Sequence, residues 1–273
     1  MASFDFDQAE GLRRMLQGPR PRIVTFLSAT PEDDKGAMLV NLGASLAQAG
    51  HEVLIVDACE VDYGVARRLG LNRGASLLQV ARQECALNQV VHPVPQGFSV
   101  VPMGLPSSAD DTRRLAKTFG VLAQQAGIVM VDGELKPDGS FPVPLMATSE
   151  IVVQVSTSPT SITNAYALIK RLSQQLGRRP FGILVTGATE AEAKVVYDNM
   201  SAAATRYLAV KLSSMGSVPA DEYLHRAARL GRAVVDAFPL AGASVAFRQL
   251  AGRFVHAMPQ FGRQGGSAHF GSS

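Results

Sequence analysis

Short, almost continuously apolar runs alternate with longer stretches of helical periodicity along most of this chain. Strands that are covered on both faces are apolar throughout, and a strand–helix alternation is typical of a parallel sheet. The pattern therefore predicts an α/β fold, with a mostly parallel twisted sheet and helices on both faces. The expected strands are residues 22–28, 52–57, 98–102, 127–132, 151–156 and 181–186, with a short one near residue 218. The expected helices are residues 36–49, 76–84, 110–125, 161–176, 190–207 and 221–230.

The length and composition fit a single globular domain with short appendages. Of the 273 residues, 47% are hydrophobic and 18% are charged, which excludes a disordered chain. The sequence has no uninterrupted apolar run of about 18 residues, so we expect no transmembrane helix. The acidic first ten residues lack the apolar core of a secretory signal. These features predict a cytoplasmic protein.

Metal, disulfide and nucleic-acid functions are not indicated. Cys59 and Cys85 are too few for a disulfide framework or a zinc site, and the five histidines are scattered. The net charge of +3 is too small to indicate direct binding of nucleic acid. Cys59 fits either an inert thiol at a strand end or a redox-sensitive one, and the inert thiol is the simpler interpretation.

The chain divides into four parts. Residues 20–240 carry the strand–helix alternation. Residues 1–19 form an N-terminal segment, with a short capped helix expected at 7–16 before a helix-breaking Gly-Pro-Arg-Pro linker at 18–21. Residues 241–260 are expected to form an amphipathic helix, and the Gly/Ser-rich residues 261–273 a flexible tail.

The loop after the first strand lies where such a sheet would bind phosphate. A phosphate loop needs glycines, because backbone N–H groups must converge on the ligand, together with a lysine and a Ser or Thr hydroxyl. Residues 28–36 read SATPEDDKG instead. Pro31 removes a donor, and Glu32, Asp33 and Asp34 are expected to place three carboxylates near the phosphate. One like-charge pair at 4 Å opposes binding by about 4 kcal/mol, which is half of a micromolar affinity of about 8 kcal/mol.

In these positions the chain resembles the MinD/ParA group of deviant Walker A ATPases, whose loop is K-G-G-x-G-K-[ST]. The resemblance implies a P-loop NTPase-like fold. When the sequences are matched on Asn41-Leu42 and on the strand ending at Asp57, Lys35 falls on the phosphate-binding lysine. Thr30 then replaces the signature lysine, and Gly36 replaces the hydroxyl residue that the family uses for Mg²⁺.

The family's other nucleotide positions are altered as well. Cys59 stands where the family has the second Asp of its D-x-D motif. The switch motif D-T-x-[AG]-G is Asp132-Gly133-Glu134-Leu135 here, and Thr186 replaces the base-reading Asn. Lys35, Asp57 and Asp132 remain as residual nucleotide-site positions. We expect a pseudo-ATPase that lacks ATP and Mg²⁺, with Lys35 as a solvated lysine of the first helical turn. The alternative is a divergent ATPase that uses these three residues and retains membrane-coupled dimerisation.

Three stretches narrow the resemblance to the FlhG/FleN regulators of flagellar number. They are DQAEGLR at residues 7–13, SPTSITNAYALIK at 158–170 with Asn164 for the usual Asp, and the closing pattern at 215–221 and 233–254. The resemblance covers about residues 5–258. It implies a regulator of flagellar number or placement, with a flagellar transcription activator and a second copy of the chain as further partners.

The first of these stretches implies a binding segment for the FlhF-type GTPase. Its matched positions are Asp7, Gln8, Ala9, Leu12 and Arg13. A glutamine offered in trans can orient the attacking water in a neighbouring GTP site, and an arginine can complement phosphate charge. The alternative for this segment is an ordinary amphipathic helix that folds back on the core.

The closing helix is the second candidate for partner contact. The family uses this helix at the membrane when ATP-driven dimerisation releases it, which implies peripheral contact at the inner membrane or cell pole. The alternative is a helix docked permanently on the domain. Its two arginines, Arg248 and Arg253, predict only weak attraction to anionic lipid. The apolar face consists of Phe247, Leu250, Ala251, Phe254, Val255 and Met258.

Overall fold

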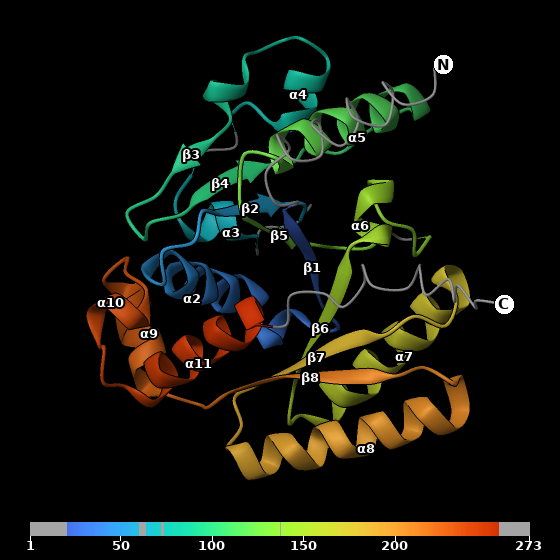
Figure 1. The fold of residues 1–273 in the computed structure, drawn as a ribbon, viewed down its shortest axis with the longest axis vertical. Coiled ribbons are helices and arrows are strands. Elements are labelled where there is room, and N and C mark those ends of the chain that lie inside the picture. The colour runs from blue at the N-terminus through green and yellow to red at the C-terminus, as the bar shows by residue number, and fades with distance from the viewer. Residues whose placement is uncertain (1–20, 60–63, 72–73, 137, 257–273) are drawn as a thin grey trace, which may run out of the picture.

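The protein forms one eight-stranded sheet with helices on both faces (Figure 1). The computed structural model describes residues 21–59, 64–71, 74–136 and 138–256. The strand order is β3-β4-β2-β5-β1-β6-β7-β8, and every neighbouring pair is parallel except β3 and β4. The strands are β1 Arg22–Ser28, β2 Val53–Asp57, β3 His92–Pro93, β4 Ser99–Pro102, β5 Ile128–Asp132, β6 Glu150–Ser156, β7 Phe181–Thr186 and β8 Leu212–Val218.

The helices divide between the two faces because successive strand residues point to opposite sides. α2, α9, α10 and α11 pack on one face, in a core that includes Val24 and Phe26. α4, α5, α7 and α8 pack on the other, against side chains such as Leu27 and Val129. The α-helices are α2 Lys35–Gln48, α3 Val65–Arg68, α4 Leu77–Ala81, α5 Ala109–Ala123, α6 Pro144–Thr148, α7 Pro159–Leu176, α8 Glu190–Leu208, α9 Glu222–Arg229, α10 Val234–Ala237 and α11 Gly242–His256, and the 3₁₀ turns are η1 Pro31–Asp33 and η2 Leu87–Gln89.

The predicted fold class is confirmed, and all seven predicted strands and six predicted helices are present. The short elements β3, α3, α6 and α10 were not predicted, because two to five residues are too few to show a periodicity. β8 spans seven residues with Ser and Gly inside it, and it tolerates them because it lies at the sheet edge and is half exposed. Residues 1–20 and 257–273 lie outside the described residues, so the N-terminal segment and the tail stay predictions.

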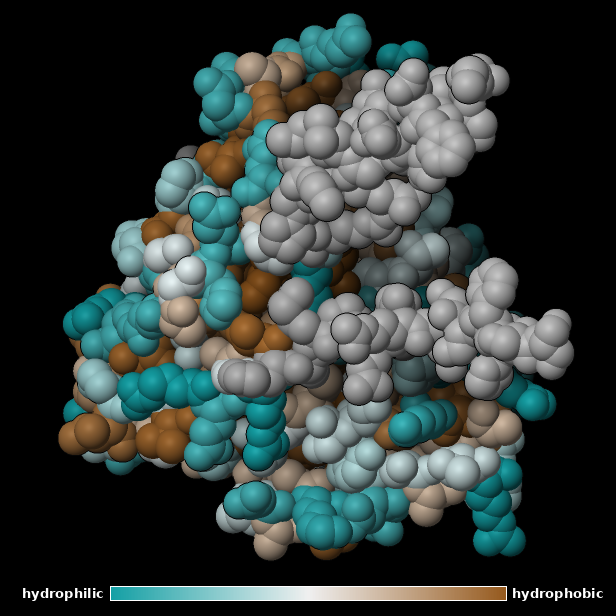
Figure 2. Space-filling view, in the orientation of Figure 1, coloured by the Kyte–Doolittle hydropathy of each residue, from teal (hydrophilic) through white to brown (hydrophobic). Residues whose placement is uncertain are grey.

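α11 is docked on the core along its apolar face. Phe247, Leu250 and Phe254 are 1%, 6% and 2% exposed, and the helix packs on α2 and β8. The Phe254 ring stacks on Phe26 at 6.2 Å, and the Arg22 guanidinium lies 4.0 Å from the centre of the Phe254 ring. The surface over α9 to α11 is a mixture of hydrophilic and hydrophobic side chains (Figure 2). In this arrangement the apolar face is therefore committed to the protein interior.

Within residues 21–256, gaps excepted, no helix is both long enough and apolar enough to span a membrane.

The carboxyl ends of the parallel strands meet at one edge of the sheet. Asp57 at the end of β2 lies in register with Asp132 at the end of β5, which also pairs with Phe26 of β1. On the other side of β1, Ser28 lies in register with Gln154 of β6. This edge brings together strand ends that are far apart in the sequence, and the loop after β1 lies directly on it.

Candidate functional site

The loop between β1 and α2 folds as a 3₁₀ turn that uses its own amides. The N–H of Asp33 donates to the Thr30 carbonyl at 3.4 Å, and that of Asp34 donates to the Pro31 carbonyl at 3.1 Å. Asp34 has a left-handed backbone with φ of 48° and is the N-cap residue of α2. A phosphate loop points its N–H groups at the ligand. Here these two N–H groups point back into the loop.

The three acidic residues of the loop point in three directions. The Asp34 carboxylate accepts from the Ala37 amide at 3.2 Å, which caps α2, and it forms an ion pair with Arg68. Asp33 is buried, and its Oδ2 accepts hydrogen bonds from hydroxyl groups on β1 and α7. Glu32 is exposed and faces a different pocket. The prediction that all three carboxylates crowd the phosphate position was wrong, since only Asp34 lines the pocket beside Lys35.

The helix N-terminus is nevertheless closed to a phosphate by Asp34. A helix N-terminus attracts anions because its first N–H groups have no intrahelical partner. The side chain of Asp34 supplies that anion from the chain itself, and Arg68 balances its charge. Asp33 is held by Ser28 at 3.1 Å and by Ser161 at 2.8 Å. The carboxylates of Asp33 and Asp34 are therefore both satisfied by groups of the protein itself.

Lys35 points into the protein and not into solvent. Its Nζ lies 2.7 Å from Oδ1 of Asp132 and donates to the carbonyls of Gly133 and of Phe26, the latter at 3.4 Å. The Lys35 side chain is 11% exposed and that of Asp132 is fully buried. Burial lowers the pKa of Lys35, but the charge and hydrogen bond of Asp132, together with the groups of Cys59 and Glu134, outweigh burial and raise the pKa. The prediction of a solvated first-turn lysine was wrong, because a buried carboxylate lies within its reach.

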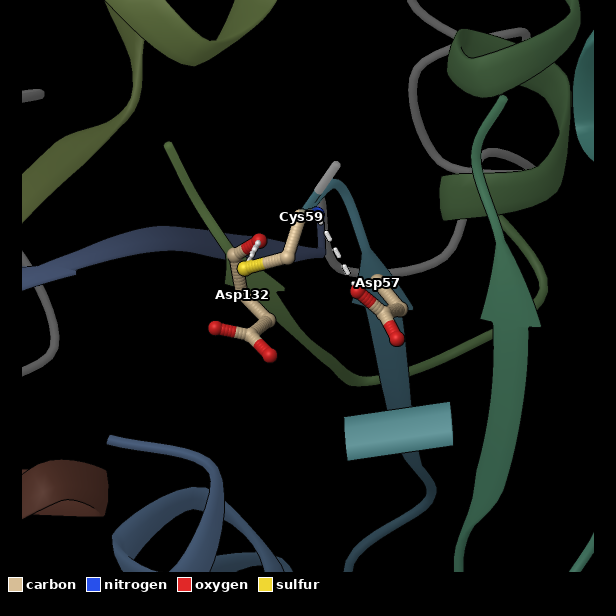
Figure 3. Close-up of side chains that lie close together, drawn as sticks. All are labelled: Asp57, Cys59 and Asp132. Atoms are coloured by element: carbon tan, nitrogen blue, oxygen red, sulfur yellow. Dashed lines mark hydrogen bonds between the residues drawn. The ribbon is translucent and has the colours of Figure 1, made fainter. Parts of the chain in front are cut away.

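Asp57, Cys59 and Asp132 lie close together (Figure 3), and the Lys35 ammonium contacts Asp132 at 2.7 Å and the Cys59 sulfur at 3.7 Å. Asp57 accepts from the Cys59 amide at 3.1 Å and from the Ala66 amide at 2.8 Å, and Asp132 accepts from the Val65 amide at 3.0 Å. The two carboxylates thereby hold the start of α3. Burial, with the adjacent Asp132 charge, raises the pKa of Asp57 above its ordinary value. The structure thus brings Lys35, Asp57 and Asp132 together, as expected for residues at neighbouring strand ends.

The three residues Asp57, Cys59 and Asp132 offer ligand atoms at a spacing that a metal ion could bridge. One ligand atom from each of Asp57, Cys59 and Asp132 lies within 4.8 Å of the others. Burial raises the pKa of the Cys59 thiol, which favours its protonated form. The Lys35 ammonium lies 2.7 Å from Asp132 and 3.7 Å from the Cys59 sulfur, so a cation of the chain contacts two of the three residues. With Lys35, the three residues form a buried polar cluster that contains its own cation.

The residues do not fit Mg-ATP. The lysine that should reach the phosphates is bonded to Asp132 and to backbone carbonyls. Gly36 offers no hydroxyl to a magnesium ion, and the N-terminus of α2 carries its own carboxylate. At the position of the base-reading residue, the Thr186 hydroxyl accepts a hydrogen bond from Nε2 of Gln154 at 3.1 Å.

A pocket of about 990 Å³ remains beside this cluster. Its charged lining is mainly basic and includes Lys136, and α7 contributes Asn164 and Arg171 to it. These two residues of α7 were not predicted as site residues from the sequence. Their spacing of seven places them on one helix face, and the 158–170 stretch, which contains Asn164, was the signal that could have found the first of them. The predicted binding residues Asp7, Gln8, Ala9, Leu12 and Arg13, and Met258 of the closing helix, lie outside the part of the chain that the structure describes.

Comparisons with known proteins agree on the family and the fold. No protein-family model matches the chain. The chain is 32% identical over 222 residues to the antiactivator FleN of Pseudomonas aeruginosa, which covers 78% of each protein. Among solved structures, it is similar to the MinD cell division protein of Aquifex aeolicus, with a TM-score of 0.67, 17% identity, and coverage of 86% of this chain and 97% of that one. It is also similar to the septum site-determining protein MinD of Pyrococcus horikoshii in complex with Mg-ADP, with a TM-score of 0.63, 16% identity, and coverage of 85% and 94%.

Proposed function

The chain belongs to the FleN family of MinD/ParA-type proteins, and from this membership and the closed loop we propose that it regulates flagellar number by binding other proteins, without turnover of ATP. The Pseudomonas relative is an antiactivator, which supports a flagellar transcription activator as one partner. The observation that carries the proposal is the Lys35–Asp132 ion pair at 2.7 Å. In this ion pair, Asp132 neutralises the lysine charge that an ATPase of this fold would offer to phosphate.

The geometry supports a pseudo-ATPase in three independent places. The lysine is paired, two loop amides donate inside the loop, and the helix N-terminus is capped by Asp34. A nucleotide would have to break all three arrangements to bind as it does in working relatives. Each buried ion pair or capped terminus that is broken opposes binding, so affinity for Mg-ATP is lost.

The second proposed partner is an FlhF-type GTPase, bound through residues 7–13. This assignment rests on the DQAEGLR stretch, with Gln8 as the residue that orients the attacking water. The test uses the full-length chain and measures GTP hydrolysis by the GTPase. We expect Gln8→Ala to abolish the stimulation and the matched change Gln17→Ala to leave it intact. Equal stimulation by both variants would remove Gln8 from the proposed role.

The core is proposed to bind the transcription activator. Co-purification of the tagged activator with the full-length chain tests this directly, in the absence of nucleotide. Binding without ATP is the expected result. Strict dependence on added ATP would favour the divergent ATPase instead, together with nucleotide-driven dimerisation.

Contact with the membrane is proposed to be conditional. The apolar residues of α11 that would enter a lipid surface are buried in the core, among them Phe247 and Phe254. We therefore expect the purified protein to remain in the supernatant when anionic vesicles are sedimented. The protein would then reside in the cytoplasm, and release of α11 would be a separate event.

A further inference from the structure

Basic side chains without acidic neighbours lie at one end of the sheet. The chain has no Asp or Glu at residues 151–189, and again none at residues 199–220. These two stretches contain the amino ends of β7 and β8 and the last turns of α7 and α8. Glu150 at the start of β6 is already paired with Arg22. The charge at this edge, opposite the Lys35 cluster, is therefore positive.

Three exposed cations and a tyrosine form a surface there. The Phe181 amide donates to the Lys211 carbonyl at 3.2 Å, which places the loop before β7 beside the loop before β8. Arg178 belongs to the first of these loops and Lys211 to the second. Arg206 and Tyr207 lie in the last turn of α8, with the guanidinium 5.3 Å from the centre of the Tyr207 ring. We call Arg178, Arg206, Tyr207 and Lys211 the amino-edge surface.

This surface is open to a partner. Tyr207 is 68% exposed, and Arg178, Arg206 and Lys211 are exposed as well. Among the residues that the structure describes, none of these three cations forms an ion pair. Tyrosine and arginine side chains are enriched where proteins bind other chains. The amino-edge surface therefore suits an acidic segment that also carries an aromatic ring.

The first ten residues of this chain have that chemistry. Their charged side chains are Asp5, Asp7 and Glu10, all acidic, and Phe4 and Phe6 alternate with the first two. Opposite charges attract, and a phenyl ring packs well against tyrosine and arginine. Residues 1–10 are therefore complementary to the amino-edge surface.

The chain also enters the fold at the same edge. β1 begins at Arg22, and β6, β7 and β8 follow from β1 across the sheet (Figure 1). Three strand spacings separate β1 from β8, which is about 14 Å. Eleven residues lie between Glu10 and Arg22, and a stretch of that length reaches up to about 36 Å. The acidic residues are thus within reach of Lys211.

We propose that residues 4–10 bind the amino-edge surface of the same chain, with carboxylates on the three cations and a phenyl ring against Tyr207. Each exposed ion pair contributes little, so this docking is reversible. It covers part of the DQAEGLR stretch, and a GTPase partner displaces the segment before it reaches Gln8. This consequence for the partner rests on the proposed function, whereas the docking itself does not.

The test treats the full-length protein with a carbodiimide, which joins a carboxylate to a lysine ammonium without a spacer. Trypsin digestion and mass spectrometry identify the joined residues. We expect Asp5, Asp7 or Glu10 to be joined to Lys211. Mixing protein with normal and heavy nitrogen separates contacts within one chain from contacts between copies. Absence of the Lys211 cross-link, preference for an exposed lysine elsewhere such as Lys117 of α5, or joining of two copies would overturn the proposal.

Matched variants test the charge of the surface. Arg178→Gln with Arg206→Gln removes two cations and leaves Lys211 as the reactive group. The Lys211 cross-link should fall about fivefold, the effect of one charge pair at 4 Å in water. The control, Arg113→Gln with Arg229→Gln, removes two exposed cations from α5 and α9 and should leave the yield unchanged. Equal yields from the two double variants would contradict the assignment.

Stimulation of the GTPase separates this inference from the proposed function. The Arg178→Gln, Arg206→Gln protein should reach half-maximal stimulation at about a fivefold lower concentration than the wild type, because its segment is released. An unchanged concentration, together with loss of the cross-link, would refute control of the partner by docking. Absence of stimulation by both proteins would refute the GTPase role, and the cross-link would still establish the docking.

Discussion

Lys35→Met should destabilise the protein strongly if Lys35 is a structural cation. The substitution keeps an unbranched stem and removes only the ammonium, which lies 2.7 Å from a carboxylate that is fully buried. Asp132 would retain the Val65 amide as the donor to its other oxygen. Removing one partner of a buried ion pair destabilises a protein by about 3–5 kcal/mol, because the other charge remains buried without compensation. We therefore expect a loss of about 3–5 kcal/mol in the free energy of unfolding.

The assay is urea unfolding of the full-length chain, with a double-mutant cycle. Asp132→Asn alone should also destabilise, while Lys35→Met combined with Asp132→Asn should lie within about 2 kcal/mol of the wild type, since no unpaired charge remains. Lys170→Met on the exposed side of α7 is the control and should change stability by less than about 0.5 kcal/mol.

The pH dependence of the Lys35→Met deficit provides a second check. The pKa of Lys35 is raised above its ordinary value of 10.5 in the folded state. Its contribution to stability is thus fully present below pH 10.5 and is lost as the pH rises through the higher folded value. The deficit should be constant between about pH 6 and about pH 9 and shrink above 10.5. A Lys35→Met protein within about 1 kcal/mol of the wild type at neutral pH would refute the structural role.

Three further outcomes are expected. Burial and the Asp132 charge raise the folded pKa of Asp57, so its ionisation opposes folding above its ordinary pKa of 3.8. In urea unfolding, the Asp57→Asn protein should therefore lose less stability relative to the wild type at pH 7 than at pH 4. The same loss at both pH values would contradict the raised pKa. Phe254→Ala should lower the free energy of unfolding by about 3–5 kcal/mol, because the ring is buried. Its control Val245→Ala, at an exposed position of the same helix, should lower it by less than about 1 kcal/mol. Equal losses would mean that α11 is not docked in solution. Burial raises the pKa of the Cys59 thiol, so iodoacetamide at pH 8 should modify it far more slowly than free cysteine, and a comparable rate measured by mass spectrometry would contradict its burial.

The sheet and its main helices could be predicted from the sequence because burial on both faces leaves a local pattern. The runs IVTFL in β1 and IVMV in β5 are apolar apart from Thr25, and the length of each run marks it as a strand. Elements such as β3, with two residues including Pro93, leave no such pattern, since their place depends on pairing with β4. β3 therefore could not be predicted from the sequence alone.

In the loop after β1, the sequence could not predict the directions of the side chains or their distant partners. The positions of Lys35 and of the acidic run were readable from the chain, but the directions of the side chains were not. Glu32 and Asp33 lie in a 3₁₀ turn, so their side chains point about 120° apart. The left-handed backbone of Asp34 directs its carboxylate to the N-terminus of α2 instead. The partner of Lys35 is Asp132, far along the chain, and a partner of Asp33 is Ser161, so neither contact leaves a local signal.

The most direct test of the account is calorimetric titration of the purified full-length protein with Mg-ATP. The paired lysine, the capped helix and the inward loop amides predict no measurable binding at millimolar ATP. Lys35→Ala should then leave the titration unchanged. Micromolar binding of ATP that Lys35→Ala abolishes would contradict the closed site and establish the protein as a divergent ATPase.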